Sequence, residues 1–269
     1  MKLDLSGKIF VIIGGTTGIG WSAAQAFVEA GAQVVVVGRN SQSVHKAAED
    51  LGKNGIALSG DAADPATAEM AIQTARRELG GFHGLYHVAG GSGRTQGDGP
   101  MHLATDEGWQ YTIQQNLTSV FNSNRAAIQA FLEMERGGVI LNMSSVLGFS
   151  PSPVFFSSHA YAAAKAAIIG LTRSAAAAYA CVNIRLNVIA PGLVETPMSE
   201  RAQENEEIMN FVKSKQPLDG GRIGVPEDLD AAAVFLMSEE SKFITGQTLA
   251  VDGGWSVTEG QWKDEENGK

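Results

Sequence analysis

The amino-acid sequence predicts an α/β fold in which helices cover both faces of a parallel sheet. From Ile9 onward, short β-branched runs alternate with alanine-rich stretches of helical length, an order that builds parallel strands through right-handed crossovers. The β-branched runs are mostly apolar and do not alternate between apolar and polar residues, as expected for strands buried on both faces. The 32 glycines suit the tight turns that such a fold needs.

The elements are expected in the following order. No Pro-, Gly- or Ser-rich linker divides the chain, so we expect a single domain over residues 1–262 and a frayed polar tail at 263–269. Helices are expected at about 18–30, 41–51, 65–79, 105–135, 158–179 and 227–237, and strands at 9–13, 34–37, 55–59, 84–88, 139–143, 184–189 and 248–251.

Composition excludes several classes of partner. A net charge of −9 without a lasting basic cluster argues against nucleic-acid binding. Cys181 is the single cysteine, which favours a reducing, cytoplasmic location, and we interpret it as a small buried apolar residue. The run 9–13 is too short for a signal-peptide core or a membrane span, so no membrane association is expected.

A glycine-rich turn follows the first expected strand. It reads Gly14-Gly15-Thr16-Thr17-Gly18-Ile19-Gly20 and leads into a helix. Such a turn brings the backbone close to a pyrophosphate, which the N–H groups and dipole of the helix start would hold. The alternative is a turn that only lets helix and strand pack closely. The chain lacks the Gly-Lys-Ser/Thr ending of a nucleoside-triphosphate loop.

The end of the second strand bears on the choice of cofactor. In dinucleotide-binding folds an acidic residue there binds both ribose hydroxyls, whereas this chain reads Val37-Gly38-Arg39-Asn40. NADP(H) is therefore favoured over NAD(H). The alternative is that Arg39 is an ordinary solvated arginine.

Tyr161 and Lys165 are the candidate acid/base pair. They lie four residues apart near the start of an expected helix, and so share one face. A nearby ammonium favours the phenolate and lowers a tyrosine pKa from about 10. Ser144 and Ser145 end the fifth strand, at the sheet edge where such folds bind ligands. The alternatives are a surface Tyr/Lys pair and serines that merely cap a turn.

Together these motifs resemble the short-chain dehydrogenase/reductase family. The resemblance rests on the ordered set of Gly14-x3-Gly18-Ile19-Gly20, Asn116, Ser145, Tyr161-x3-Lys165 and Pro191-Gly192. It covers nearly the whole chain and extends to Asp61, Ala89-Gly90, Gly224-x-Pro226-Glu227-Asp228, Gly246-Gln247 and Val251-Asp252-Gly253-Gly254-Trp255.

The resemblance implies a Rossmann-type, doubly wound sheet of seven parallel strands, usually in a homotetramer. Tyr161 would exchange the proton, Ser145 would hydrogen-bond the substrate oxygen, and Lys165 would bind the nicotinamide ribose. Asn116 would kink its helix and place a water in a proton relay; its alternative role is that of a buried asparagine satisfying backbone groups. The implied cofactor contacts are Gly14, Thr16, Thr17, Gly18, Ile19, Gly20, Arg39, Asn40, Asp61, Ala62, Val88, Ala89, Gly90, Tyr161, Lys165, Pro191, Gly192, Val194 and Thr196.

The chain departs from the family pattern at two places. Ile13 stands where Thr is frequent, and His87-Val88 stands where the family often has Asn-Asn. We expect apolar packing around Ile13 and Val88 to replace a polar link, and His87 to be a hydrogen-bonded core residue. No His, Cys and carboxylate set has metal-ligand spacing, so no metal is expected.

The expected activity is the interconversion of a small-molecule ketone and a secondary alcohol. The stretch 147–159 carries apolar and aromatic side chains that favour a bulky apolar or ring-containing substrate, unless they pack a core or subunit surface. Residues 198–215 are expected to form a lid. The alternative function is a cofactor-binding regulatory protein without turnover, and a sugar-nucleotide epimerase is disfavoured by glycine spacing and chain length.

Overall fold

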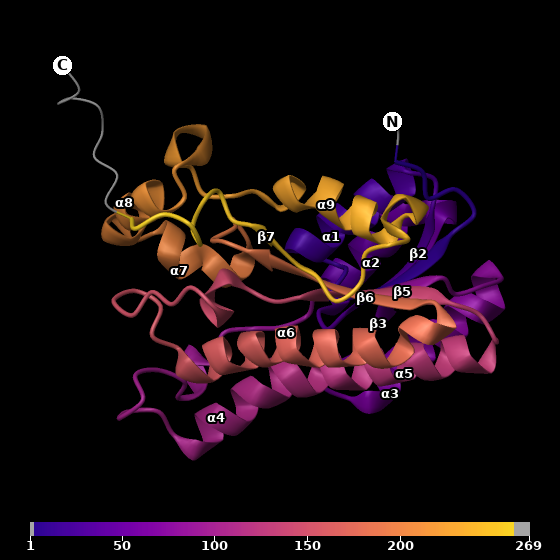
Figure 1. Ribbon diagram of the computed structural model, residues 1–269, viewed down its shortest axis with the longest axis horizontal. Helices are drawn as coiled ribbons and strands as arrows, with labels where there is room; N and C mark the ends of the chain where they lie inside the picture. The colour runs from indigo at the N-terminus through magenta and orange to yellow at the C-terminus, as the bar shows by residue number, and fades with distance from the viewer. Residues whose placement is uncertain (1–2, 261–269) are drawn as a thin grey trace.

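The computed structural model describes residues 3–260 and has a fully parallel sheet at its centre (Figure 1). The strand order is β3-β2-β1-β4-β5-β6-β7, so the chain reverses its winding direction between β1 and β4. This confirms the doubly wound, seven-stranded fold. The strands are β1 Ile9–Ile13, β2 Gln33–Gly38, β3 Gly55–Ser59, β4 Gly84–His87, β5 Gly138–Met143, β6 Ile184–Pro191 and β7 Thr248–Val251.

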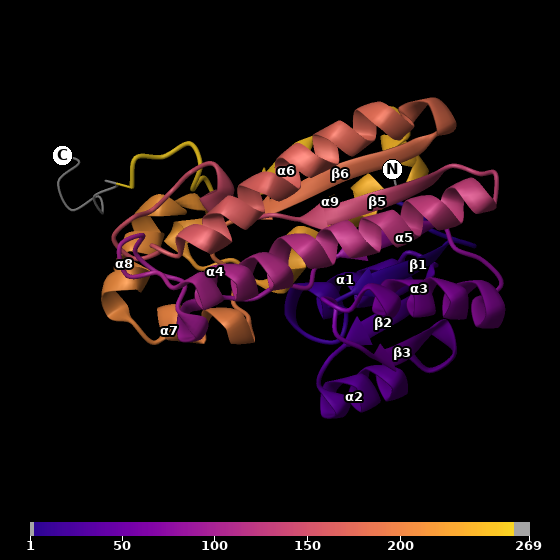
Figure 2. The same cartoon turned by 90° about the horizontal axis from the view of Figure 1, so that it is seen from below.

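Helices form a layer on each face of the sheet, as Figures 1 and 2 show. One layer contains α1, α2 and α9, and the other contains α3, α5 and α6. None of the helices within 3–260 is long and apolar enough to cross a membrane. The helix bounds are α1 Gly18–Glu29, α2 Ser41–Leu51, α3 Pro65–Thr74, α4 Asp106–Ile113, α5 Ser119–Glu133, α6 His159–Tyr179, α7 Glu200–Gln203, α8 Glu206–Lys215 and α9 Asp230–Met237.

The central strand β1 divides its side chains between two cores. Phe10 and Ile12 pack into the core under α1 and α9, whereas Val11 and Ile13 pack into the core under α3 and α5. Successive side chains of a strand point to opposite faces, so an uninterrupted apolar run serves both cores at once. The sheet is thereby held rigid, and the strand ends have defined positions.

Two expected helices are interrupted by π turns. The stretch expected at 105–135 divides into α4 and α5 around a π segment at Gln114–Thr118, and α3 passes into one at Ala75–Leu79. The first break contains Asn116, whose Nδ2 donates to the Thr112 carbonyl oxygen at 2.9 Å. That side-chain bond competes with the helix ladder and explains the local widening.

The structure corrects one expectation and extends another. Cys181 is exposed, not buried, because it lies in a single 3₁₀ turn between α6 and β6 at the surface. The expected lid at 198–215 contains α7 and α8, which lie beyond the carboxyl ends of the strands (Figure 2). The expected tail at 263–269 lies outside the described residues.

Candidate active site

A cavity of about 720 Å³ opens at the carboxyl edge of the sheet. Its walls come from the turns that follow β1 to β6, as the parallel topology requires. Of the predicted residues, only Gly20 and Asn116 lie behind the wall. The predicted residues that line the cavity are Gly14, Thr16, Thr17, Gly18, Ile19, Arg39, Asn40, Asp61, Ala62, Val88, Ala89, Gly90, Ser145, Tyr161, Lys165, Pro191, Gly192, Val194 and Thr196.

The glycine turn leaves its backbone open to the cavity. Gly14 has φ 85°, and a Cβ built on it would lie 2.6 Å from the Ala89 nitrogen. A Cβ on Gly20 would overlap the Gly14 carbonyl oxygen, so Gly20 permits the helix to cross the turn. Thr17 is the N-cap residue of α1, but its side chain accepts no hydrogen bond from the helix backbone. The first turn of α1 carries no acidic residue. A helix start with free N–H groups facing a cavity fits a pyrophosphate.

Polar side chains gather at the end of β2. Arg39 is exposed and its Nη1 donates to Gln115 Oε1 at 3.3 Å. Asn40 caps α2 by accepting from the Ser43 nitrogen at 3.1 Å, and the Ser43 hydroxyl lies 3.3 Å from Thr16 Oγ1. Ser43 was not among the predicted site residues, although its position three residues after an Asn N-cap is a signal that could have found it.

Tyr161 and Lys165 share the cavity-facing side of α6. The Lys165 Nζ lies 5.4 Å from the centroid of the Tyr161 ring and donates to the Met143 carbonyl oxygen at 3.0 Å. The Ser144 hydroxyl donates to the Lys165 carbonyl oxygen at 2.7 Å, which ties α6 to the end of β5. The predicted pair is therefore placed by β5 as well as by its own helix.

The electrostatics of this pair differ from the sequence-based expectation. Burial raises the pKa of Tyr161 to about 12, and the hydrogen bond from the Ser145 hydroxyl lowers it only in part. Burial also lowers the pKa of Lys165 to about 8. Desolvation thus sets the direction of both pKa shifts, because both groups are buried. The phenol is held protonated, as a proton donor requires.

Asn116 is buried behind the cavity wall. Its amide exchanges two hydrogen bonds with the backbone of Gly91, at 2.9 and 3.1 Å. A Cβ on the neighbouring Gly90 would lie 2.7 Å from Asn116 Oδ1 and 3.4 Å from Lys165 Nζ. The π turn therefore holds the segment after β4 against α6.

Asp98 was missed by sequence reasoning. Its side chain is buried, 4% exposed, and its two oxygens accept from the backbone nitrogens of Ala160 and Tyr161, each at 3.0 Å. It thus caps the first turn of α6, where the local N-cap Ser158 makes no side-chain cap. The two partners lie 62 residues apart, so only the unfulfilled cap at Ser158 hints at the arrangement.

His87 is a satisfied core residue, as expected. It is fully buried; its Nδ1 lies 2.7 Å from Ser123 Oγ and its Nε2 lies 3.1 Å from the Ala89 carbonyl oxygen. Burial, followed by the charge of Lys165, lowers its pKa to about 3. Ile13 is buried in the core on that side of the sheet, in agreement with the expected apolar packing there.

The aromatic side chains expected to face a substrate are partly used for packing. The rings of Phe155 and Phe211 lie 5.2 Å apart, and Trp255 makes edge contacts with Phe156 and Phe211. The loop before α6 is thus joined to α8, which lies in the expected lid segment. Phe156 and Trp255 also line the cavity, where they contribute an apolar wall.

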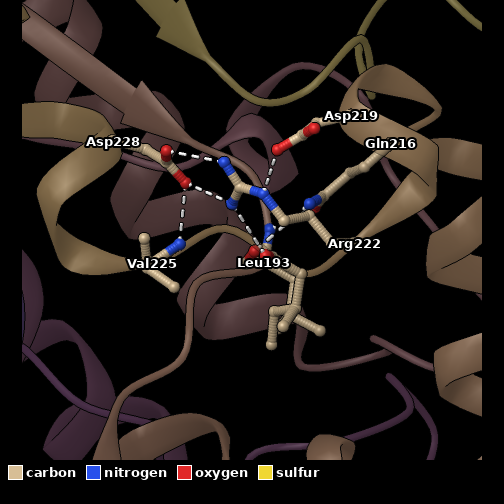
Figure 3. A network of polar contacts seen from close by, with 7 residues as sticks. Leu193, Gln216, Asp219, Arg222, Val225 and Asp228 are labelled. Atoms are coloured by element: carbon tan, nitrogen blue, oxygen red, sulfur yellow. Dashed lines mark hydrogen bonds and ion pairs between the residues drawn. The ribbon is translucent and has the colours of Figure 1, made fainter.

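A polar network fastens the segment after β6 (Figure 3). The side chain of Gln216 accepts from the Leu193 nitrogen and donates to the Leu193 carbonyl oxygen. Nearby, Arg222 binds Asp228 through two N–H groups, at 2.6 and 2.8 Å, and also contacts Asp219. These bonds hold the loop that carries the predicted cofactor contacts Val194 and Thr196.

Comparisons with known proteins agree with this geometry. A family model described as enoyl-(acyl carrier protein) reductase matches residues 14–256. The chain is 36% identical to a 3-oxoacyl-[acyl-carrier-protein] reductase of Chlamydia muridarum, covering 94% of this chain and 99% of the relative. It is 34% identical to an NADP-dependent (R)-specific alcohol dehydrogenase of Lentilactobacillus kefiri, covering 94% and 98%.

A solved structure extends the likeness to three dimensions. A short-chain type dehydrogenase/reductase from Mycobacterium ulcerans superposes with a TM-score of 0.87 at 28% identity, covering 95% of this chain and 92% of that one. In the described range, no three His, Cys, Asp or Glu side chains are arranged to hold a metal ion. The chain belongs to the short-chain dehydrogenase/reductase family of oxidoreductases, which act on CH–OH and C=O groups.

Proposed function

We propose that the protein reduces a ketone to a secondary alcohol, and runs the reverse reaction, with NADP(H) and with Tyr161 as the acid/base group. The observation that carries the proposal is that Ser145, Tyr161 and Lys165 line the same cavity as the glycine turn. A pyrophosphate site and a buried proton donor in one cavity are what hydride transfer to a carbonyl needs.

The proposed mechanism assigns one task to each side chain. A nicotinamide cofactor, when bound, would supply the hydride. The Tyr161 phenol gives its proton to the carbonyl oxygen, and the Lys165 ammonium stabilises the phenolate that forms. The Ser145 Oγ accepts from the Leu147 nitrogen at 3.2 Å, and its O–H donates to the Tyr161 oxygen. In the substrate complex this O–H would donate to the substrate oxygen instead.

Asn116 completes the proposed set as the residue that shapes the site from behind. Its amide is engaged by the backbone of Gly91 and Thr112, so it fixes the π turn and the segment after β4. We retain for it the part in a proton relay that the family resemblance implies.

The proposed preference for NADP(H) rests on the end of β2. Arg39 lies beside Thr16, Asn40 and Ser43 in the cavity wall, and no acidic residue follows β2 there. A guanidinium next to hydroxyl and amide groups suits a 2′-phosphate. NAD(H) is the alternative that the experiment below distinguishes.

The proposed assembly is a homotetramer in the cytoplasm. Large apolar side chains are exposed along α4 and α5, among them Trp109, Phe121 and Leu132, which are 45 to 47% exposed. An apolar helix face of this kind is typical of subunit interfaces. Light scattering of the purified protein should give the mass of four chains.

The decisive experiment is a panel of ketones and secondary alcohols assayed with NADPH and NADH in parallel. We expect ketone-dependent oxidation of NADPH that exceeds the rate with NADH. A large preference for NADH would refute the assignment of Arg39. Tight NADPH binding without turnover of any carbonyl would instead favour the regulatory alternative.

A further inference from the structure

Two arginines meet at the end of the cavity that contains Tyr161. The Nη2 atoms of Arg94 and Arg201 both donate to the carbonyl oxygen of Phe155, at 3.1 and 3.3 Å. Arg94 lies after β4, Arg201 lies in α7, and Phe155 lies in the loop between Ser145 and Tyr161. Both arginines line the cavity. Three distant segments thus place two guanidinium groups in the wall of the cavity that also contains Tyr161.

One neutral oxygen does not balance two positive charges. Among the described residues neither arginine has an ion pair, and Arg94 is half-buried. Burial and the charge of Arg201 both lower the pKa of Arg94, although Asp98 opposes them. The oxygens of Asp98 already accept from the first turn of α6. The repulsion between the two guanidinium groups is therefore left for a ligand to offset.

Both guanidinium groups keep donors available. A guanidinium has five N–H donors, and each of these side chains uses one of its own for the Phe155 oxygen. Among residues 3–260, Asp61 is the only carboxylate that lines the cavity, and it follows β3, an edge strand of the sheet. The end of the cavity near Tyr161 is therefore basic, although the whole chain has a formal net charge of −9.

We propose that the substrate carries an anionic oxygen group, a carboxylate, sulfonate or phosphate, that Arg94 and Arg201 bind while its carbonyl faces Tyr161. Paired guanidinium groups suit such planar or tetrahedral oxyanions by geometry as well as charge. Leu147, Phe156 and Met198 line the cavity and would cover the carbon chain between the two ends. The inference rests on the proposed ketone reduction and replaces the expectation of a wholly apolar substrate.

The test compares keto acids with their methyl esters. We would assay 3-oxobutanoate, 4-oxopentanoate and 5-oxohexanoate with NADPH beside the matching esters, and hydroxyacetone phosphate beside hydroxyacetone. The chain-length series is needed because the arginines do not by themselves set the spacing. We expect at least one anion to exceed its neutral partner by about tenfold or more in kcat/KM, as charge-assisted hydrogen bonds predict.

Single variants then assign the effect to the arginines. Arg94→Gln and Arg201→Gln should each raise KM for the preferred anion by about tenfold, leave the ester unchanged and reduce the dependence of KM on salt. Arg201→Lys should restore part of the loss. Arg77→Gln, which removes the same charge from an exposed site outside the cavity, is the control.

A binding measurement separates this inference from the proposed function. Pentanoate has no carbonyl to reduce, and calorimetry should show that it binds the NADPH complex of the native protein more tightly than the Arg201→Gln complex. Equal binding of pentanoate to the two complexes overturns the anion site. So does a ratio of kcat/KM for acid over ester that is the same in the native protein and in both variants. If no carbonyl is turned over but pentanoate binds through the arginines, the proposed reaction fails and the anion site stands.

Discussion

The two ends of the cavity are shaped by different parts of the chain: one by the backbone and the other by side chains. Around the glycine turn, the shape comes from the main chain, with Gly14 pressed against Ala89 and Gly20 against Gly14. Around Tyr161, it comes from buried polar side chains that reach across the fold, such as Lys165 to Met143 and Asp98 to α6. Both ends lie on one rigid sheet edge.

The difference teaches which substitutions separate binding from chemistry. Where the backbone shapes the cavity, an added side chain disturbs the backbone itself, so folding and cofactor binding are affected together. A side-chain-built end can lose a functional group while the surrounding fold is kept. The experiments that follow test this contrast.

Tyr161→Phe should have the largest effect. Removing the hydroxyl removes the proton donor, so we expect kcat to fall by about a thousandfold, within the usual range for general acid catalysis. The ring is kept, and NADPH affinity measured by fluorescence titration should change by less than about twofold. A variant that keeps wild-type kcat would show that Tyr161 is not the acid/base group.

Gly14→Ala should damage stability and binding together. The new Cβ would lie 2.6 Å from the Ala89 nitrogen at a φ of 85°, so we expect a loss of about 3 kcal/mol in the free energy of unfolding. Gly52→Ala is the matched control, because Gly52 also has positive φ, 53°, but a Cβ there would meet nothing within 4 Å. It should cost about 1 kcal/mol, leaving NADPH binding intact. If urea unfolding shows that both variants lose the same free energy of unfolding, the contact between residue 14 and Ala89 does not explain the effect.

The buried His87, which lies behind the cavity in β4, makes the stability of the fold depend on pH. The folded chain holds this imidazole neutral down to its pKa of about 3, whereas the unfolded chain protonates near pH 6.5. Its contribution to stability is therefore complete above about pH 6.5 and is lost as pH falls toward 3, on the order of 3 kcal/mol by pH 4. We would measure the free energy of unfolding with denaturant between pH 8 and pH 4. In the His87→Asn variant, this free energy should fall less steeply with decreasing pH than in the native protein. Parallel slopes in the two proteins would reject this account.

Asp98→Asn should have the smallest effect and act by positioning. Losing the charge at the start of α6 should cost about 1 kcal/mol in stability and lower kcat several-fold with little change in KM for NADPH. Asp64→Asn removes the same charge from the N-cap of α3, outside the cavity wall, and should leave kcat unchanged. If the two variants lower kcat alike, Asp98 has no special part in placing Tyr161.

Some features of the site could be predicted because their signals are local. The glycine turn and the Tyr161–Lys165 spacing are short motifs whose geometry follows from one turn or one helix. The strands were found to within a few residues, since apolar runs flanked by helical stretches report burial on both faces. The π turn at Asn116 was expected only as a kink, because residue type alone does not specify the change in helix width.

The remaining features depend on contacts between distant segments. The order of strands, the basic end formed by Arg94 and Arg201, and the cap from Asp98 all join residues tens of positions apart, which periodicity does not record. Burial decides the direction of the pKa shifts of Tyr161 and Lys165, and burial at a cavity wall is a property of the packed molecule. Local spacing thus predicted the Tyr161–Lys165 pair as an acid/base centre and the glycine turn as a phosphate site. Tertiary packing decided that burial raises the pKa of the phenol and that the cavity wall holds two arginines that have no ion pair within residues 3–260.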